Sequence, residues 1–142
     1  MIRRAGPDDV DAIAEVFGRS FGSLTFLPQL HTPEEHRAFF ARVVAADEVW
    51  AWEEDGTVVG FAAVDETTLN HLYVDPARTR HGIGSALLAH VKSRRPDGFH
   101  LWTFQDNAGA RRFYERHGCH PVRFTDGAGN EERTPDVQYA WP

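Results

Sequence analysis

The chain is poor in cysteine, with Cys119 as the only one among 142 residues. A single thiol excludes a disulfide within the chain, which fits a reducing compartment, so we expect a cytoplasmic protein. The sequence also lacks any apolar run near the length of about 18 residues that suggests a membrane span. Arg3 and Arg4 precede a polar segment rather than an apolar one. We therefore expect neither a secretory leader nor attachment to a membrane.

Several sequence motifs of known chemistry are absent as well. The glycine-containing segment at residues 79–85 lacks the Gly-Lys-Ser/Thr of a nucleoside-triphosphate loop, and Leu87 stands where a dinucleotide-binding fingerprint needs Gly or Ala. There is no Gly-x-Ser-x-Gly elbow of a serine hydrolase. His117 and His120 have only Cys119 beside them, so we expect no metal site.

Charge is unevenly divided along the chain, whose net value is −6. Residues 1–66 hold 13 acidic residues and 5 arginines, a balance of −8, whereas residues 67–142 hold 8 acidic and 10 basic residues, a balance of +2. A basic second half suits a polyphosphate ligand, and the acidic first half disfavours nucleic acid as a partner. The acidic residues could attract a cationic amine, although they also fit the solvated faces of two helices.

Hydrophobic spacing predicts alternating strands and helices within one domain over residues 1–142. Asp55-Gly56 predicts a type I′ hairpin turn, and Thr32 with Glu35 forms a capping-box pattern ahead of a helix whose inner face would carry Phe39. The elements expected are a strand at 2–5, helices at 7–21 and 33–44, strands at 49–52, 58–64 and 68–74, a helix at 82–94, a strand at 99–104, a helix at 107–117, and two closing strands around the turn at 126–130.

Residues 72–88 form the most informative segment of the sequence. An apolar run ends at Asp75-Pro76, a short basic loop follows, and Gly82 and Gly84 begin an amphipathic helix. A helix N-terminus carries unpaired N–H groups and a partial positive charge, and glycines let phosphate oxygens approach the backbone closely. The segment therefore suits an anion, although an ordinary strand-to-helix turn would also explain it when it is taken alone.

A second segment, Asn107-Ala-Gly-Ala-Arg-Arg-Phe-Tyr-Glu-Arg-His-Gly118, makes the first more specific. Together the two resemble the GNAT (Gcn5-related N-acetyltransferase) family, whose acetyl-CoA loop reads (Arg/Gln)-x-x-Gly-x-(Gly/Ala) and whose second motif reads roughly Asn-x-x-Ala-x-x-Phe-Tyr-x-x-x-Gly-Phe. The resemblance covers about residues 68–121. It implies a mixed α/β fold, with a largely antiparallel sheet of six to seven strands flanked by about four helices. It also implies acetyl transfer from acetyl-CoA to a primary amine.

The same resemblance implies where acetyl-CoA binds. In the family, the fourth and fifth strands splay apart and the pantetheine arm lies between them. Carried over, the backbone of Leu72, Tyr73 and Val74 would pair with the arm, and the N–H of Val74 would polarise the thioester carbonyl. The other cofactor-binding residues that the resemblance implies are Arg80, His81, Gly82, Ile83, Gly84, Ser85, Asn107 and Tyr114.

Tyr114 also takes a catalytic role by this resemblance, as the donor of a proton to the departing CoA thiolate. It lies seven residues after Asn107, two helical turns on and hence on the same helix face. A thiolate leaves more easily when it can collect a proton, so the chemistry needs such a donor. Packing beside Phe113 in the core is the alternative explanation for this tyrosine.

The sequence departs from the family pattern at Thr79, where the loop motif prefers Arg or Gln, and at the general base. Thr68 and Trp102 stand where many members have a glutamate on the fourth or fifth strand. An attacking ammonium must lose its proton, so a base or water chain has to come from elsewhere. The candidates are Glu66, His71 and Glu35, with Gln105 as a residue that could position a water molecule. The missing glutamates also leave open an acyl-CoA-binding domain without catalysis.

The acceptor is not determined by the sequence. The loop at 22–31 and the second helix would shape its pocket, in which Phe21, Phe26, Leu27 and Phe39 could form an apolar wall or simply pack in the core. We favour a small-molecule amine, with a protein N-terminus or lysine as the alternatives. The final strand, ending at Trp141, looks exposed and leaves a homodimer open.

Overall fold

The computed structural model describes residues 1–79 and 81–142. Within them, seven strands form one sheet in the order β1-β2-β3-β4-β5-β7-β6, antiparallel except between β4 and β5. The strands are β1 Ile2–Arg4, β2 Glu48–Glu54, β3 Thr57–Val64, β4 Thr68–Val74, β5 Phe99–Phe104, β6 His120–Phe124 and β7 Asp136–Trp141. The helices are α1 Val10–Gly22, α2 Pro33–Ala46, α3 Ile83–Arg94 and α4 Ala108–Arg116, with 3-10 turns at Pro7–Asp9 and Pro76–Arg78. This confirms the predicted fold class.

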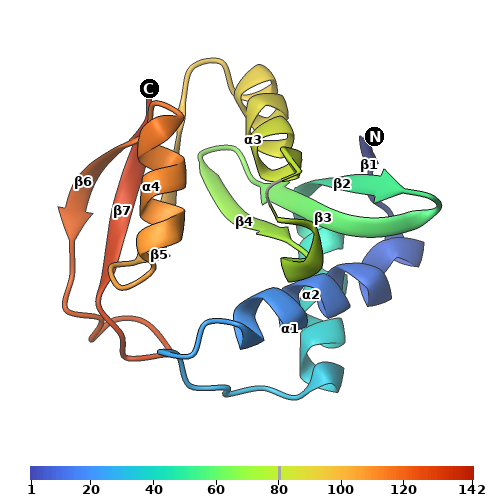
Figure 1. Ribbon diagram of the computed structural model, residues 1–142, viewed down its shortest axis with the longest axis horizontal. Helices are drawn as coiled ribbons and strands as arrows, with labels where there is room; N and C mark the ends of the chain where they lie inside the picture. The colour runs from blue at the N-terminus through green and yellow to red at the C-terminus, as the bar shows by residue number, and fades with distance from the viewer. Residues whose placement is uncertain (80) are drawn as a thin grey trace.

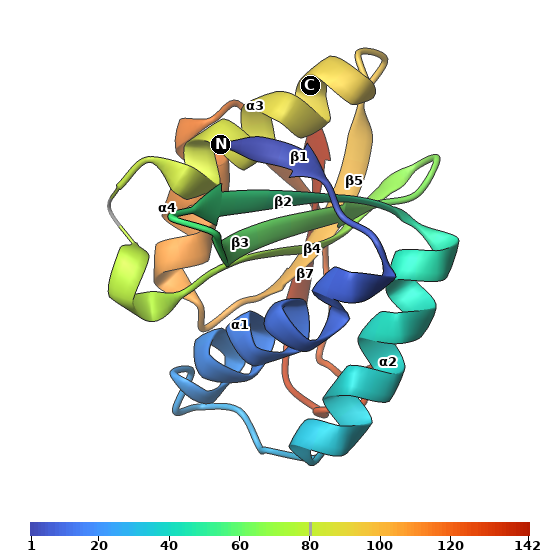
Figure 2. The same ribbon diagram turned by 90° about the vertical axis from the view of Figure 1, so that its right-hand side faces the viewer.

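Helices cover both faces of the sheet and enclose two apolar cores. Figure 2 shows α1 and α2 below strands β1–β4 and α3 above them. Strand β3 is buried on both faces, so its alternate side chains enter different cores: Phe61 packs with α1 and α2, whereas Ala62 packs with α3, α4, β5 and β7. No helix within the described residues has the length and apolar character needed to cross a bilayer.

The predicted local signals form as expected. Thr32 accepts a hydrogen bond from the N–H of Glu35, and the Glu35 carboxylate accepts one from the N–H of Thr32, which completes the capping box of α2. Asp55 and Gly56 have φ of 51° and 79°, so both central residues of the β2–β3 turn are left-handed, as a type I′ turn requires.

The parallel strands β4 and β5 pair over only two positions. Thr68 lies opposite His100 and Leu69 opposite Leu101, and beyond these residues the strands diverge. In Figure 1, β5, β6, β7 and α4 lie on one side of the resulting opening, and the other strands with α1, α2 and α3 lie on the other. The splay that the family resemblance implied is therefore present in this chain.

Two expectations about exposure are wrong. The final strand β7 lies between β5 and β6, so the sheet ends at β6 and not at the strand that carries Trp141. Phe39, expected on the inner face of α2, is 42% exposed, whereas Phe40 is fully buried. Adjacent residues point about 100° apart around a helix of 3.6 residues per turn, so Phe40 takes the core position and Phe39 lies beside it, partly exposed, against His71 of β4.

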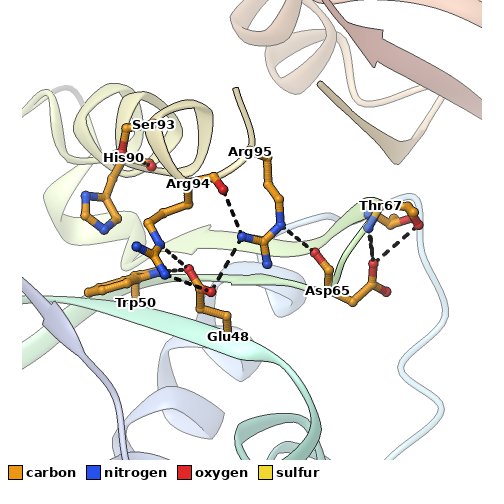
Figure 3. A network of polar contacts seen from close by, with 9 residues as sticks. Glu48, Trp50, Asp65, Thr67, His90, Ser93, Arg94 and Arg95 are labelled. Atoms are coloured by element: carbon orange, nitrogen blue, oxygen red, sulfur yellow. Dashed lines mark hydrogen bonds and ion pairs between the residues drawn. The ribbon is translucent and has the colours of Figure 1, made fainter. Parts of the chain in front are cut away.

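A polar network anchors the C-terminal end of α3 (Figure 3). Arg94 Nε donates to Glu48 of β2 at 2.7 Å, and Arg95 Nε donates to the carbonyl oxygen of Asp65 in the β3–β4 turn at 2.9 Å. Trp50 Nε1 donates to the same Glu48 carboxylate at 2.8 Å. The Arg94 guanidinium holds the pKa of Glu48 at about 2. One end of α3 is thus fixed to the sheet, which helps to position its opposite end at the opening.

Candidate active site

A groove of about 660 Å³ runs past the N-terminus of α3. Its walls are the end of β4, the loop before α3, the first turn of α3 and one side of α4. The lining brings together most of the residues predicted to bind the cofactor. These are Leu72, Val74, Gly82, Ile83, Gly84, Ser85 and Tyr114.

Two glycines shape the entrance to α3 for different reasons. Gly82 is the N-cap residue with φ of 76°, a left-handed conformation that side chains other than glycine rarely adopt. Gly84 lies against α4, where an added Cβ would stand 3.5 Å from the ring of Phe113. The N–H groups of the first turn and the positive end of the helix dipole therefore face the groove, an arrangement that favours an anion.

Arginines from two elements make the groove basic. Arg78 lines it and also donates to Glu54 at 2.6 Å, while Arg112 and Arg116 reach it from α4. Sequence reasoning missed the two α4 arginines, although their spacing of four residues places them on one face of the helix. Arg80, predicted to contact pyrophosphate, lies outside the described residues. His81 is exposed and does not line the groove.

The edge of β4 presents alternate backbone groups to the opening. Asp75 N–H donates to Val59 O of the β3 side at 2.8 Å. In an antiparallel pair, every second residue points its N–H and C=O groups to the same neighbour, so Tyr73 also points to β3. Leu72 and Val74 then point away from β3, towards the space from which β5 has diverged. The prediction for Tyr73 is wrong in this respect, since its backbone faces β3 and its ring packs on Phe17 at 5.0 Å.

A smaller inner cavity of about 90 Å³ lies between β4 and β5. It shares Leu72, Ala110 and Tyr114 with the groove, so Tyr114 stands where the two spaces meet. Asn107 lines this inner cavity as the N-cap of α4, and its Oδ1 accepts the N–H of Ala110 at 3.1 Å. The predicted pair Asn107 and Tyr114 is thus brought to one site.

Tyr114 keeps its proton over the whole neutral range. Burial raises its pKa well above the usual value of 10, and the neighbouring Tyr73 and Cys119 raise it further. Its ring also makes an edge contact with Phe113 at 5.2 Å. The packing role and the proton-donor role are therefore compatible, because the side chain packs and still lines both cavities.

His71 is the predicted base that lies in the inner cavity. Its ring is packed against Phe39 and Phe40 at 5.6 and 5.1 Å, and its Nδ1 is buried without a hydrogen-bond partner among the described residues. Burial lowers its pKa to about 4, so the imidazole is neutral at pH 7. A neutral imidazole can accept a proton or a hydrogen bond.

The other two candidate bases, and Gln105 as the candidate for positioning a water molecule, lie elsewhere or are already hydrogen-bonded. Glu66 is exposed in the β3–β4 turn, at the end where β4 and β5 still pair, so the structure does not bring it to the opening. Gln105 Nε2 donates to the carbonyl oxygens of Thr125 and Asp136 and ties β5 to the β6–β7 loop. Glu35 belongs to the capping box of α2.

An outer cavity of about 620 Å³ adjoins the inner one along β5. Trp102, Thr103 and Phe104 line both spaces. The rest of its wall comes largely from the β6–β7 loop and carries acidic side chains, among them Glu132. Sequence reasoning did not single out this loop, because only the fold places it beside β5.

The α1–α2 loop and the β6–β7 loop meet on this side of the sheet (Figure 1). His31 Nε2 lies 2.5 Å from Glu131 Oε1, and the ring of Phe26 lies 6.2 Å from that of Phe104. The pKa of His31 is raised, first by Glu131 and then by Glu35. Of the predicted apolar wall, Leu27 is buried while Phe26 and Phe39 remain partly exposed.

Comparison with known proteins identifies the family to which this chain belongs. The family model of the acetyltransferase (GNAT) domain matches residues 45–119. A peptidyl-lysine N-acetyltransferase, YiaC of Escherichia coli (strain K12), is 38% identical over 95 residues, which cover 66% of this chain and 62% of the relative. The match thus spans about three fifths of the length of that relative.

Solved structures share the fold over nearly the whole chain. A GCN5-related N-acetyltransferase from Rhodopseudomonas palustris superimposes with a TM-score of 0.83 at 18% identity, covering 99% of this chain and 94% of that one. The PaiA N-acetyltransferase from Thermoplasma acidophilum, solved in complex with coenzyme A, gives a TM-score of 0.73 at 16% identity and covers 99% of this chain and 97% of that one.

Proposed function

Because the chain belongs to the GNAT family of acetyltransferases, we propose that it transfers the acetyl group of acetyl-CoA to a primary amine at the opening between β4 and β5. The observation that carries the proposal is the position of Tyr114, which lines both the basic groove and the inner cavity. The donor enters along the groove and the amine enters from the opposite side, so that the two reactants meet beside this hydroxyl.

The groove fits the chemistry of acetyl-CoA. The first turn of α3 offers backbone N–H groups to pyrophosphate, and Arg112 and Arg116 supply the positive charge that phosphates need. The outward-facing backbone of Leu72 and Val74 suits the amide groups of a pantetheine arm. The coenzyme A complex of the Thermoplasma relative supports this ligand class for the fold.

In the proposed reaction, the amine attacks the thioester carbon directly. The N–H of Val74 stabilises the developing oxyanion, and Tyr114 donates its proton to the sulfur as the C–S bond breaks. His71 relays to water the proton that the ammonium must lose before attack, because its neutral imidazole lies in the inner cavity and its low pKa makes it give the proton up again. A second proton leaves the nitrogen in the tetrahedral adduct and restores Tyr114, which yields the amide and the free thiol.

We favour a small amine as the acceptor. The contact between His31 and Glu131 joins the two loops over the acceptor side, which favours a closed pocket over a groove that a peptide could run through. A lysine side chain is the second candidate, since the E. coli relative is named a peptidyl-lysine N-acetyltransferase. The amine end of a lysine side chain can enter a closed pocket while the rest of the peptide stays outside.

The test is release of free thiol from acetyl-CoA, with a panel of small primary amines and with lysine-containing peptides of matched concentration. Turnover with small amines supports the favoured acceptor, and turnover confined to peptides supports the second. Binding of acetyl-CoA without turnover of any amine would instead identify an acyl-CoA-binding domain and contradict the proposal.

A further inference from the structure

The outer cavity is lined by three carboxylates, and two of them accept hydrogen bonds from neighbouring residues. Asp136 accepts hydrogen bonds from Thr125 and from Asn130 Nδ2, and Asp126 accepts one from the N–H of Ala128. The Glu132 carboxylate has neither a hydrogen bond nor an ion pair with any of the residues that the structure describes, and the side chain is half-buried. Its carboxylate lines the cavity unpaired within the described part of the chain, while Arg123, which lines the same cavity, stacks on Trp102 and makes no ion pair with Glu132.

The electrostatic effect of Glu132 reaches the inner cavity. Tyr73 lines that cavity, and its pKa is raised to about 12, first by burial and then by the negative charge of Glu132. The outer and inner cavities also share the wall formed by Trp102, Thr103 and Phe104. A ligand that extends along β5 would therefore have one end near Tyr114 and the other near Glu132.

We propose that the acceptor is a small amine with a second cationic group, which the Glu132 carboxylate binds in the outer cavity while the first amine is acetylated in the inner one. This inference rests on the proposed function and adds a specificity-determining residue to it. The inner cavity supplies aromatic surface and a neutral imidazole rather than a carboxylate, so the unpaired Glu132 carboxylate selects for a cation one cavity away from the reacting nitrogen.

Trp102 fits this arrangement. It is 42% exposed and lies on the shared wall of the two cavities. The Arg123 guanidinium already lies 5.9 Å from the centre of its ring. The tryptophan therefore supplies an apolar and π-rich wall along which an alkyl chain can lie between the two amines.

The experiment compares two acceptors of equal chain length. Cadaverine has an ammonium group at each end of a five-carbon chain, and pentylamine has only one. We expect a kcat/KM about six- to tenfold higher for cadaverine with the unmodified protein, because a partly exposed ion pair contributes about three- to fivefold and the two equivalent amines double that figure. In Glu132→Gln the ratio should fall to about two, the statistical advantage of two equivalent amines, through a higher KM for cadaverine with kcat nearly unchanged.

Glu66→Gln is the matched control, since it removes the same charge from an exposed turn away from the cavities. It should keep the preference, and thermal unfolding should show both variants folded. A preference of no more than about twofold in the unmodified protein would overturn the inference alone, as would a preference in Glu132→Gln as large as that of the unmodified protein. Absence of turnover with every amine and peptide tested would overturn the proposed function and, with it, the inference.

Discussion

His31 Nε2 and Glu131 Oε1 lie 2.5 Å apart, although the two residues are 100 positions apart in the sequence. Their contact joins the loop after α1 to the loop between β6 and β7. His31 Nδ1 also lies 3.3 Å from Glu35 at the start of α2. Two carboxylates therefore surround one imidazole, and its protonated form stabilises the closed arrangement of the loops on the acceptor side.

The titration of His31 should report this contact directly. Its pKa is raised above the ordinary 6.5, so the added stability is complete below that value and is lost as the pH rises through the folded-state pKa. Glu131→Gln should lower the midpoint of His31 in an NMR titration towards 6.5, while Glu66→Gln should leave it unchanged. An unchanged midpoint in Glu131→Gln would show that the contact does not exist in solution.

Tyr114→Phe should slow acetyl transfer without preventing folding or binding. The hydroxyl has no hydrogen-bond partner among the described residues, so its removal leaves the packing of the ring intact. Loss of a general acid should reduce kcat by about 100-fold, while the Kd for acetyl-CoA measured by calorimetry stays within about twofold. Full kcat in this variant would exclude Tyr114 as the donor of the proton to sulfur.

The α4 arginines should contribute to cofactor affinity. Arg112→Gln and Arg116→Gln should each weaken coenzyme A binding about three- to tenfold, because each removes one charge from the wall of the groove. The effect should shrink at high salt. Arg42→Gln, on the exposed side of α2, is the control and should bind as the unmodified protein does. Identical affinities in all three variants would place the phosphates elsewhere.

Glu48 should make stability depend on acid pH. Its pKa is lowered from 4.5 to about 2, chiefly by the hydrogen bond from Arg94, so its contribution is present above pH 4.5 and is lost as the pH falls towards 2. This shift corresponds to about 3 kcal/mol at most. Urea unfolding should find Glu48→Gln less stable at neutral pH, with the difference from the unmodified protein narrowing between pH 4.5 and 2. A constant difference over that range would contradict the assignment.

Local chemistry made much of the fold predictable. The capping box at Thr32 and Glu35 and the turn at Asp55-Gly56 depend only on neighbouring residues, and both form. Exposure was harder to predict, because it depends on strand order. Nothing near β7 in the sequence indicates that it pairs with both β5 and β6, which is why its predicted exposure was wrong.

The candidate site shows the same contrast between features set by neighbouring residues, which were predictable, and features set by the fold, which were not. The residues of the basic groove lie in two short segments with recognisable spacing, and half of them were predicted. The acceptor side is assembled from the α1–α2 loop, β5 and the β6–β7 loop, and its contacts join residues as distant as His31 and Glu131. Neither charge nor spacing in the sequence indicated that Glu132 would face the cavity beside Trp102.

The most direct test of the central claim is to follow backbone amide resonances while acetyl-CoA is added to the isotope-labelled protein. If the donor lies between β4 and β5, the largest shifts should fall on Leu72, Val74 and residues 82–85, with ATP at the same concentration failing to reproduce the changes at Leu72 and Val74. Shifts confined to the outer cavity or to β6, or no shifts at saturating acetyl-CoA, would contradict the account.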